Sequence, residues 1–147
     1  MNTQQILDTI KKHDDAKIFM GVYAIDQLPS KIEYPCCMIV NTDPSTEKGE
    51  HWLAIYFDSY KNAEFFDSFG YDPKFYKLSN FFKDKCFKCT FNNIRIQSLF
   101  SDFCGHYSCL YILYKLKKYP LSKLLKNFSF NLLQNDFIIQ KLINKLC

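Results

Sequence analysis

Three short apolar runs follow one another closely in the first half of the chain, and they restrict the possible folds more than any other feature. They cover residues 36–40, 51–57 and 63–66, and the two segments between them are rich in turn residues. Such runs of strand-forming residues predict a meander of three strands with consecutive antiparallel pairing. Because each run is apolar throughout, both faces of the predicted sheet are expected to be buried.

A longer apolar stretch, residues 104–116, predicts a helix of three turns. Ser101 and Asp102 directly precede this stretch, and either side chain is suited to cap the helix N-terminus. Apolar side chains cover most of the circumference of the predicted helix, which indicates that it is central and buried.

The other predicted elements are short, and turn residues or prolines separate them. They are a helix in the first dozen residues, an extended or turn segment at 21–29, a helix at 74–83, a strand at 90–97 with alternating Ile94 and Ile96, and one or two helices after a break near Tyr119 and Pro120.

The length of 147 residues fits one domain, residues 1–147. We divide it into an N-terminal helical segment, residues 1–20, a central part, and a lysine-rich helical tail, residues 113–147. The 48% share of hydrophobic residues excludes intrinsic disorder. No run of about 18 uncharged apolar residues is present, so no membrane partner is expected.

Two features predict a reduced, intracellular setting for the protein instead of secretion. The polar, amphipathic start of the chain differs from a signal peptide. The seven cysteines are an odd number, so at least one thiol lacks an internal partner.

The lysine-rich tail concentrates the positive charge of the chain. It holds seven lysines and a single acid, Asp136, so its formal charge is +6 and residues 1–112 carry −2. Such a charge distribution is compatible with DNA or with an acidic partner. The alternative is a pair of helices whose lysines are simply solvated, and no interleaving arginines or aromatic residues favour nucleic acid over it.

Cys104 is the candidate nucleophile. It stands in the first turn of the predicted helix, where the backbone N–H groups and the helix dipole favour a thiolate. Asp102 acts in the opposite direction, because a nearby carboxylate raises the pKa of a thiol. Gly105 leaves the backbone open to an approaching carbonyl group, so the N–H groups near Cys104 are candidate oxyanion donors.

The strand order supplies partners for this thiol. His51 opens the predicted central strand and Asp67 closes the next, and these ends adjoin in an antiparallel pair. Gln97 lies seven residues before Cys104 and offers an amide donor for a tetrahedral oxyanion. Each residue alone has a structural explanation, since a buried cysteine is usually a small hydrophobe; the four together indicate nucleophilic catalysis.

These motifs resemble a known family. The segments GEHWLAIYF, FFDSFG and QSLFSDFCGHYSC are similar to those of the adenovirus-type cysteine endoprotease (adenain), which is related in fold to the SUMO-deconjugating proteases. The resemblance extends from about residue 21 to residue 114. It implies an α+β fold in which a central helix bearing the nucleophile packs on a mixed or antiparallel sheet.

The resemblance also implies roles for the residues and a function. Cys104 would be the nucleophile, His51 the general base, Asp67 its orienting acid and Gln97 an oxyanion donor. Trp52 and Gly105 would contact substrate, and residues 21–29 would line the cleft. The implied activity is cleavage of viral capsid or core precursors at Gly-Gly or Gly-X-Gly sequences, in the host cytoplasm, the nucleus or the virion.

The expected enzyme is a monomer with a protein substrate, and the sequence requires no cofactor or metal. The family implies activation by a viral peptide or by DNA, but this chain is shorter than the adenovirus enzymes, so neither activator is carried over. DNA would bind through the lysine-rich tail.

Three alternatives remain open at this stage. The first is a protease that deconjugates ubiquitin-like proteins, and the second is a DNA-binding module without activity. The third is a binding module with structural zinc, held by Cys86, Cys89, His106 and Cys109 at plausible spacings. No role is assigned to Cys36, Cys37 and Cys147.

Overall fold

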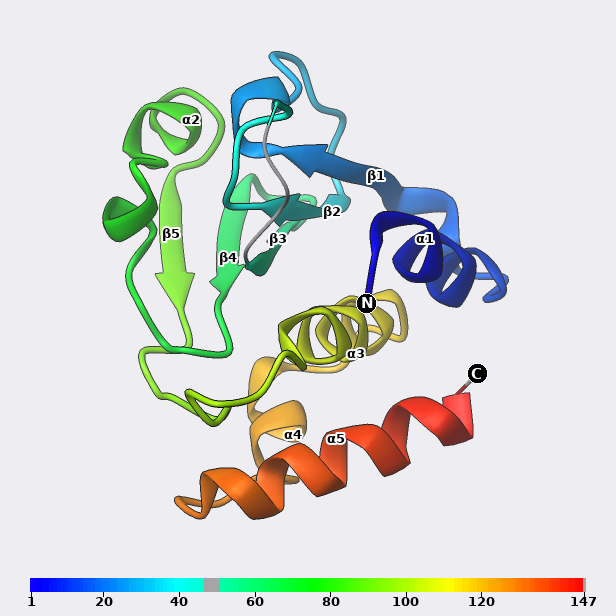
Figure 1. Cartoon of the computed structure of the whole chain (residues 1–147). Coiled ribbons are helices and arrows are strands. Elements are labelled where there is room, and N and C mark those ends of the chain that lie inside the picture. The colour runs from blue at the N-terminus through cyan, green and yellow to red at the C-terminus, as the bar shows by residue number, and fades with distance from the viewer. Residues whose placement is uncertain (47–50, 147) are drawn as a thin grey trace.

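The computed structural model describes residues 1–46 and 51–146, and within them five strands form one mixed sheet in the order β1-β2-β3-β4-β5 (Figure 1). The three central strands pair antiparallel, which confirms the predicted meander. The two outer strands pair parallel to their neighbours. The strands are β1 (Phe19–Ala24), β2 (Cys36–Asn41), β3 (Trp52–Phe57), β4 (Asn62–Phe66) and β5 (Lys88–Phe91).

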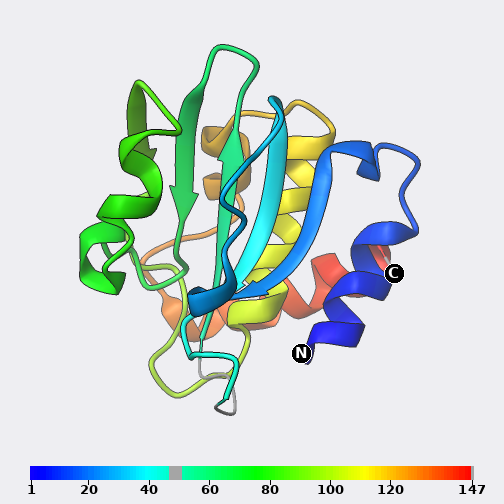
Figure 2. The same cartoon turned by 90° about the horizontal axis from the view of Figure 1, so that it is seen from above.

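The helices lie mainly on one side of the sheet. The predicted helix 104–116 is confirmed as α3, which packs on β3, while α1, α4 and α5 pack against α3 (Figures 1 and 2). The α-helices are α1 (Thr3–Lys11), α2 (Ser79–Lys83), α3 (Cys104–Leu116), α4 (Leu121–Leu125) and α5 (Leu132–Leu146), and the short 3-10 helices are Ala16–Ile18, Ile25–Gln27 and Pro73–Tyr76.

Both faces of the sheet are buried, as the unbroken apolar runs predict. Every residue of β2 is buried, and alternate side chains enter opposite cores because successive residues of a strand point to opposite faces. Ile39 joins the core that includes α3, and Met38 joins the core beneath α2. On the α3 side, Phe66 stacks on Tyr111 with ring centroids 4.8 Å apart. This packing fixes α3 against the strands that carry the candidate site.

The predicted strand at 90–97 is wrong in its extent. Strand β5 ends at Phe91, because Asn93 adopts a left-handed conformation (φ 38°) and Asn92 uses its side chain to bind other segments. The Asn92 Nδ2 atom donates to the carbonyl of Asp67 at 2.6 Å and to that of Ile94 at 3.0 Å. Residues 92–97 therefore form a loop that docks on the end of β4.

The predicted helix 74–83 needs correction. It is interrupted, since Lys77 adopts a left-handed conformation (φ 59°) between the 3-10 helix and α2. The predicted extended or turn segment 21–29 is confirmed, because its first half belongs to strand β1 and a 3-10 helix follows. Local patterns did not distinguish a strand from a turn here, since β1 gains its hydrogen bonds from β2, outside the segment itself.

The tail breaks into α4 and α5 after residues 119–120, as predicted. Within the ranges 1–46 and 51–146, no helix combines the length and the apolar character needed to span a membrane.

Candidate active site

Cys104 is the first residue of α3, so its thiol lies at the positive end of the helix dipole. Phe103 occupies the N-cap position, and no side chain caps the helix. The prediction that Ser101 or Asp102 is the cap is therefore wrong. Ser101 accepts hydrogen bonds from Gln97 instead, because the loop before α3 folds back on itself.

His51 and Asp67 meet at one edge of the sheet. His51 directly precedes β3 and Asp67 directly follows β4, and antiparallel pairing brings these strand ends together. The His51 Nε2 atom lies 2.7 Å from Asp67 Oδ1, and both side chains are buried. The other ring nitrogen, Nδ1, is available for the hydrogen bond between His51 and the Cys104 thiol.

The Asp67 carboxylate is fixed by its hydrogen bonds. Besides His51, its Oδ1 atom accepts from the backbone N–H of Phe69 at 2.9 Å. Its Oδ2 atom accepts from the backbone N–H of Tyr71 at 3.2 Å and from the Tyr76 hydroxyl at 2.6 Å. A buried carboxylate with four donors has little freedom to rotate, so it determines the orientation of the imidazole.

Two aromatic residues support the His51 ring. Phe69 stacks on it with centroids 4.5 Å apart, and Tyr76 lies parallel to it at 6.2 Å. The sequence interpretation missed both residues. The sequence could have indicated Phe69, since it stands in the same motif, FFDSFG, as Asp67. Tyr76 comes from a separate 3-10 helix, and only the tertiary structure brings it to the site.

The electrostatics of Cys104 and His51 favour proton transfer from the thiol to the imidazole. Burial lowers the pKa of His51, but hydrogen bonds and charge from Asp67 and Cys104 outweigh it and raise this pKa to about 9. Burial raises the pKa of the Cys104 thiol, but the hydrogen bond and charge of His51, together with backbone hydrogen bonds from Trp52 and Gly105, outweigh burial, so this pKa falls below its ordinary value. Both shifts stabilise a thiolate–imidazolium pair.

Gln97 is buried in the loop that leads to Cys104. Its Nε2 atom donates to the Ser101 carbonyl at 2.9 Å and to the Ser101 hydroxyl at 3.2 Å, and its Oε1 atom accepts from Ser68 Oγ at 2.5 Å. The loop is held to the end of β4, because the Ile96 N–H donates to the Ser68 carbonyl at 2.9 Å. The amide of Gln97 is thus positioned before α3, but a bound oxyanion would have to replace Ser101 as acceptor.

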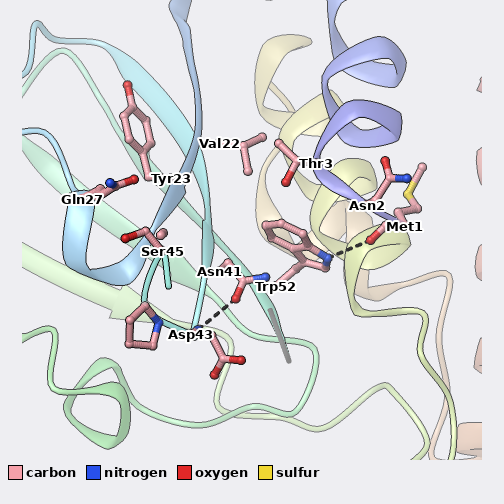
Figure 3. A pocket seen from close by; sticks show the side chains of 12 residues that line it. Met1, Asn2, Thr3, Val22, Tyr23, Gln27, Asn41, Asp43, Ser45 and Trp52 are labelled. Carbon is pink, nitrogen blue, oxygen red and sulfur yellow. Dashed lines mark hydrogen bonds between the residues drawn. The ribbon is translucent and has the colours of Figure 1, made fainter. Parts of the chain in front are cut away.

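Trp52 and Gly105 pack on each other beside the thiol. A Cβ atom on Gly105 would lie 3.1 Å from the Trp52 ring and 3.0 Å from the Met1 side chain, so glycine makes room for this tryptophan. The indole N–H donates to the Met1 carbonyl at 3.0 Å (Figure 3). Gly105 therefore serves the packing of Trp52, in addition to any role toward substrate.

A cleft of about 520 Å³ opens next to Trp52 (Figure 3). The predicted cleft segment 21–29 lines it through Val22, Tyr23, Ala24 and Gln27. Asn41 and Ser45 add polar groups beside this segment, since Asn41 pairs with Ala24 and Ser45 is hydrogen-bonded to Asp26. Residues 1–3 line the other side (Figure 3). The cleft is lined by Trp52, the residue that follows His51, so it opens beside the candidate site.

The four candidate zinc ligands do not form a site. Cys109 is buried in the core on α3, whereas Cys89 is exposed on the edge strand β5. Among the residues that the structure describes, no three histidine, cysteine or acidic side chains gather as metal ligands would, and no two of the described cysteines are joined to each other by a disulfide. Cys147 lies outside the described residues.

A thiol at a helix start, an imidazole and a buried carboxylate in series are the arrangement expected of a cysteine hydrolase. A family model described as adenovirus endoprotease matches residues 19–144. The chain belongs to the adenovirus endoprotease family.

Two adenovirus relatives show how much of the chain is shared. The chain is 31% identical to the protease of bovine adenovirus C serotype 10 over 92 residues, which cover 52% of this chain and 46% of that protease. It is 34% identical to the protease of bovine adenovirus 7 over 106 residues, which cover 63% and 52% of the two chains. The chain thus spans about half the length of these relatives.

Solved structures confirm the α+β fold. The ASFV pS273R protease matches with a TM-score of 0.62 at 19% identity, over 94% of this chain and 65% of that one. ChlaDub1 from Chlamydia trachomatis matches with a TM-score of 0.51 at 17% identity, over 76% and 59% of the two chains. At these identities, the likeness concerns the fold alone.

Proposed function

We propose that the chain is a cysteine endopeptidase in which Cys104 is the nucleophile, His51 the general base and Asp67 its orienting acid. The observation that carries the proposal is the series of contacts from the α3 N-terminus through the His51 ring to the fixed Asp67 carboxylate. Membership of the adenovirus endoprotease family supports it.

In the proposed reaction, His51 takes the Cys104 proton and the thiolate attacks the scissile carbonyl carbon. A C–S bond forms, and backbone N–H groups at the start of α3, with Gln97, stabilise the resulting oxyanion. The C–N bond then breaks as the imidazolium gives its proton to the leaving amine. Water hydrolyses the thioester, releases the new carboxyl terminus and restores the thiol.

The substrates that we propose are capsid or core precursors cleaved at Gly-Gly or Gly-X-Gly sequences. Relatives named as viral proteases support this choice over release of ubiquitin-like proteins. Cleavage of a Gly-Gly peptide embedded in a longer chain, with no cleavage of a ubiquitin-like C-terminus, would distinguish the two. The opposite preference would assign the chain to deconjugation.

The first test is the rate of iodoacetamide alkylation of Cys104 as a function of pH, located by mass spectrometry. Because the pKa of this thiol is lowered and that of His51 is raised to about 9, fast alkylation should persist well below the ordinary thiol pKa of about 8.5. In His51→Ala, the thiol loses the hydrogen bond and charge of the imidazole, and only backbone hydrogen bonds from Trp52 and Gly105 still oppose the effect of burial on its pKa. Its alkylation at neutral pH should therefore slow by about tenfold or more.

Two controls accompany this test. His106→Ala changes a different histidine, which lies on α3 itself, and we expect no loss of the low-pH reactivity. Cys89 serves as an internal thiol standard, since it is exposed on the edge strand β5. If Cys104 were alkylated like an ordinary thiol in both the wild type and His51→Ala, the proposed pair would be absent.

A further inference from the structure

A second pocket lies between α5 and the loop that precedes α3, apart from the cleft beside Trp52. Its volume is about 260 Å³, below the roughly 300–1,000 Å³ that is usual for small-molecule sites, so it suits a single side chain. One face of α5 forms one wall at the helical spacing i, i+3, i+4 and i+7, and the loop forms the other. The wall residues used below are Phe100, Phe103, Leu133, Asp136 and Phe137.

The pocket contains a carboxylate with an unused acceptor. Asp136 is only 5% exposed, and its Oδ1 atom accepts from the Tyr107 hydroxyl at 2.8 Å. Its buried Oδ2 atom has no hydrogen-bond partner among the described residues. A buried carboxylate oxygen without a donor is costly to the folded state, so this atom calls for a donor from a bound group.

The charge of the surroundings makes this carboxylate unusual. Asp136 is the single acid between residues 113 and 147, a stretch with seven lysines. None of these lysines lines the pocket. Although lysines are the commonest charged residues of the tail, the pocket walls therefore supply no cation to pair with Asp136.

The mouth of the pocket is apolar and open to solvent. Phe100 is 97% exposed and Phe137 is 68% exposed, and Leu133 is exposed beside them. Large apolar side chains that are exposed together around a polar group are typical of binding surfaces. Because Phe100, Phe103 and Phe137 are aromatic, the walls favour a planar guanidinium over an ammonium group.

We propose that this pocket binds an arginine side chain of a polypeptide partner. The guanidinium would donate to Asp136 Oδ2, the methylene groups would lie against the aromatic walls, and apolar residues flanking the arginine would cover the exposed mouth. The choice of occupant rests on charge complementarity, since a purely apolar ligand would leave the carboxylate unpaired. The site is independent of the proposed catalysis.

The test is an NMR titration of the ¹⁵N-labelled full chain with the blocked peptide acetyl-Leu-Arg-Leu-amide. We expect saturable shifts of the amide signals of residues 98–103 and 133–140. A matched peptide with citrulline in place of arginine keeps the shape but lacks the charge, and it should bind roughly tenfold more weakly or worse. Equal binding of the two peptides, or no saturable shift with arginine, would overturn the proposal.

Paired variants locate the binding. Asp136→Asn removes the charge and should weaken arginine binding roughly tenfold or more, while Asp102→Asn on the neighbouring loop should not. Phe137→Ala removes an exposed wall and should also weaken binding, whereas Phe130→Ala, which is 90% exposed outside the pocket, should not. Phe137→Ala decides the matter if Asp136→Asn fails to fold, because an exposed side chain is not needed for folding.

Sedimentation of the same proteins tests the competing occupant. Self-association that Phe137→Ala abolishes, without arginine binding, would assign the face to a second copy of the chain and reject the proposal. A wild-type chain that stays monomeric and binds the arginine peptide would support it.

Discussion

At the scale of single residues, the orientation of the His51 imidazole, the proposed general base, depends on how Asp67 is held. The carboxylate is fully buried, and the Tyr76 hydroxyl is its only side-chain donor besides His51 among the described residues. Tyr76 also lies parallel to the His51 ring. One tyrosine therefore acts on both partners, through its hydroxyl on the acid and through its ring on the base.

We predict that Tyr76→Phe lowers the free energy of unfolding by about 1–3 kcal/mol, because Asp67 loses a buried, charge-assisted hydrogen bond while the aromatic ring remains. Chemical denaturation measures this change, and the alkylation rate of Cys104 should fall with it as His51 becomes less well oriented. Tyr60→Phe is the control, since Tyr60 is exposed. A variant as stable and as reactive as wild type would show that Tyr76 does not position the acid.

At the scale of elements, the turn after β4 organises the site. It carries Asp67 and Ser68, and it receives the loop 92–97 through Ser68. Gly70 is required in this turn for two reasons. Its φ of +79° disfavours other residues, and a Cβ atom there would lie 2.6 Å from the carbonyl carbon of Ile94.

We predict that Gly70→Ala destabilises the fold by about 1–3 kcal/mol or more, because the loop must move away in addition to the backbone strain. Gly21→Ala is a matched control, since Gly21 also has a positive φ (+135°) but a Cβ atom there would meet nothing within 4 Å. Denaturant unfolding of the two variants separates the cost of backbone strain, which both share, from the cost of the contact with Ile94, which only Gly70→Ala has. Equal losses in both would mean that the contact with Ile94 is unimportant.

At the scale of the whole molecule, the charge is unevenly distributed. Of the seven tail lysines, Lys115 is paired with Glu64 at 2.7 Å, and the other six are exposed. Two of these, Lys117 and Lys118, stand at the end of α3. A basic surface of this kind attracts the DNA backbone through counterion release.

We predict weak, non-specific binding of duplex DNA whose affinity decreases with salt. The double variant Lys117→Glu/Lys118→Glu should bind more weakly and lower the steepness of the salt dependence by about two counterions. Lys11→Glu/Lys12→Glu makes the same charge change on α1 and should have less effect. Fluorescence anisotropy over a range of salt measures both, and equal losses would point to net charge instead of a tail surface.

The sequence predicted those parts of the site that depend on strand order. The meander, the helix that begins at Cys104 and the meeting of His51 with Asp67 all follow from apolar runs and antiparallel pairing. The predicted strand 90–97 extends beyond β5 because the isoleucines at 94 and 96 alternate as they would in a strand. The side chain of Asn92 ends that strand by binding Asp67 instead.

The amino-acid sequence by itself determined the elements that local patterns define, and with them the order of the candidate catalytic residues. Only the tertiary structure decided which distant groups complete the site: the Tyr76 hydroxyl on Asp67, the Ser101 acceptors of Gln97, and the packing of Trp52 on Gly105. The reason is physical. Apolar periodicity and backbone pairing act between near neighbours or along whole strands, whereas single side-chain hydrogen bonds between distant segments leave no periodic pattern in the sequence.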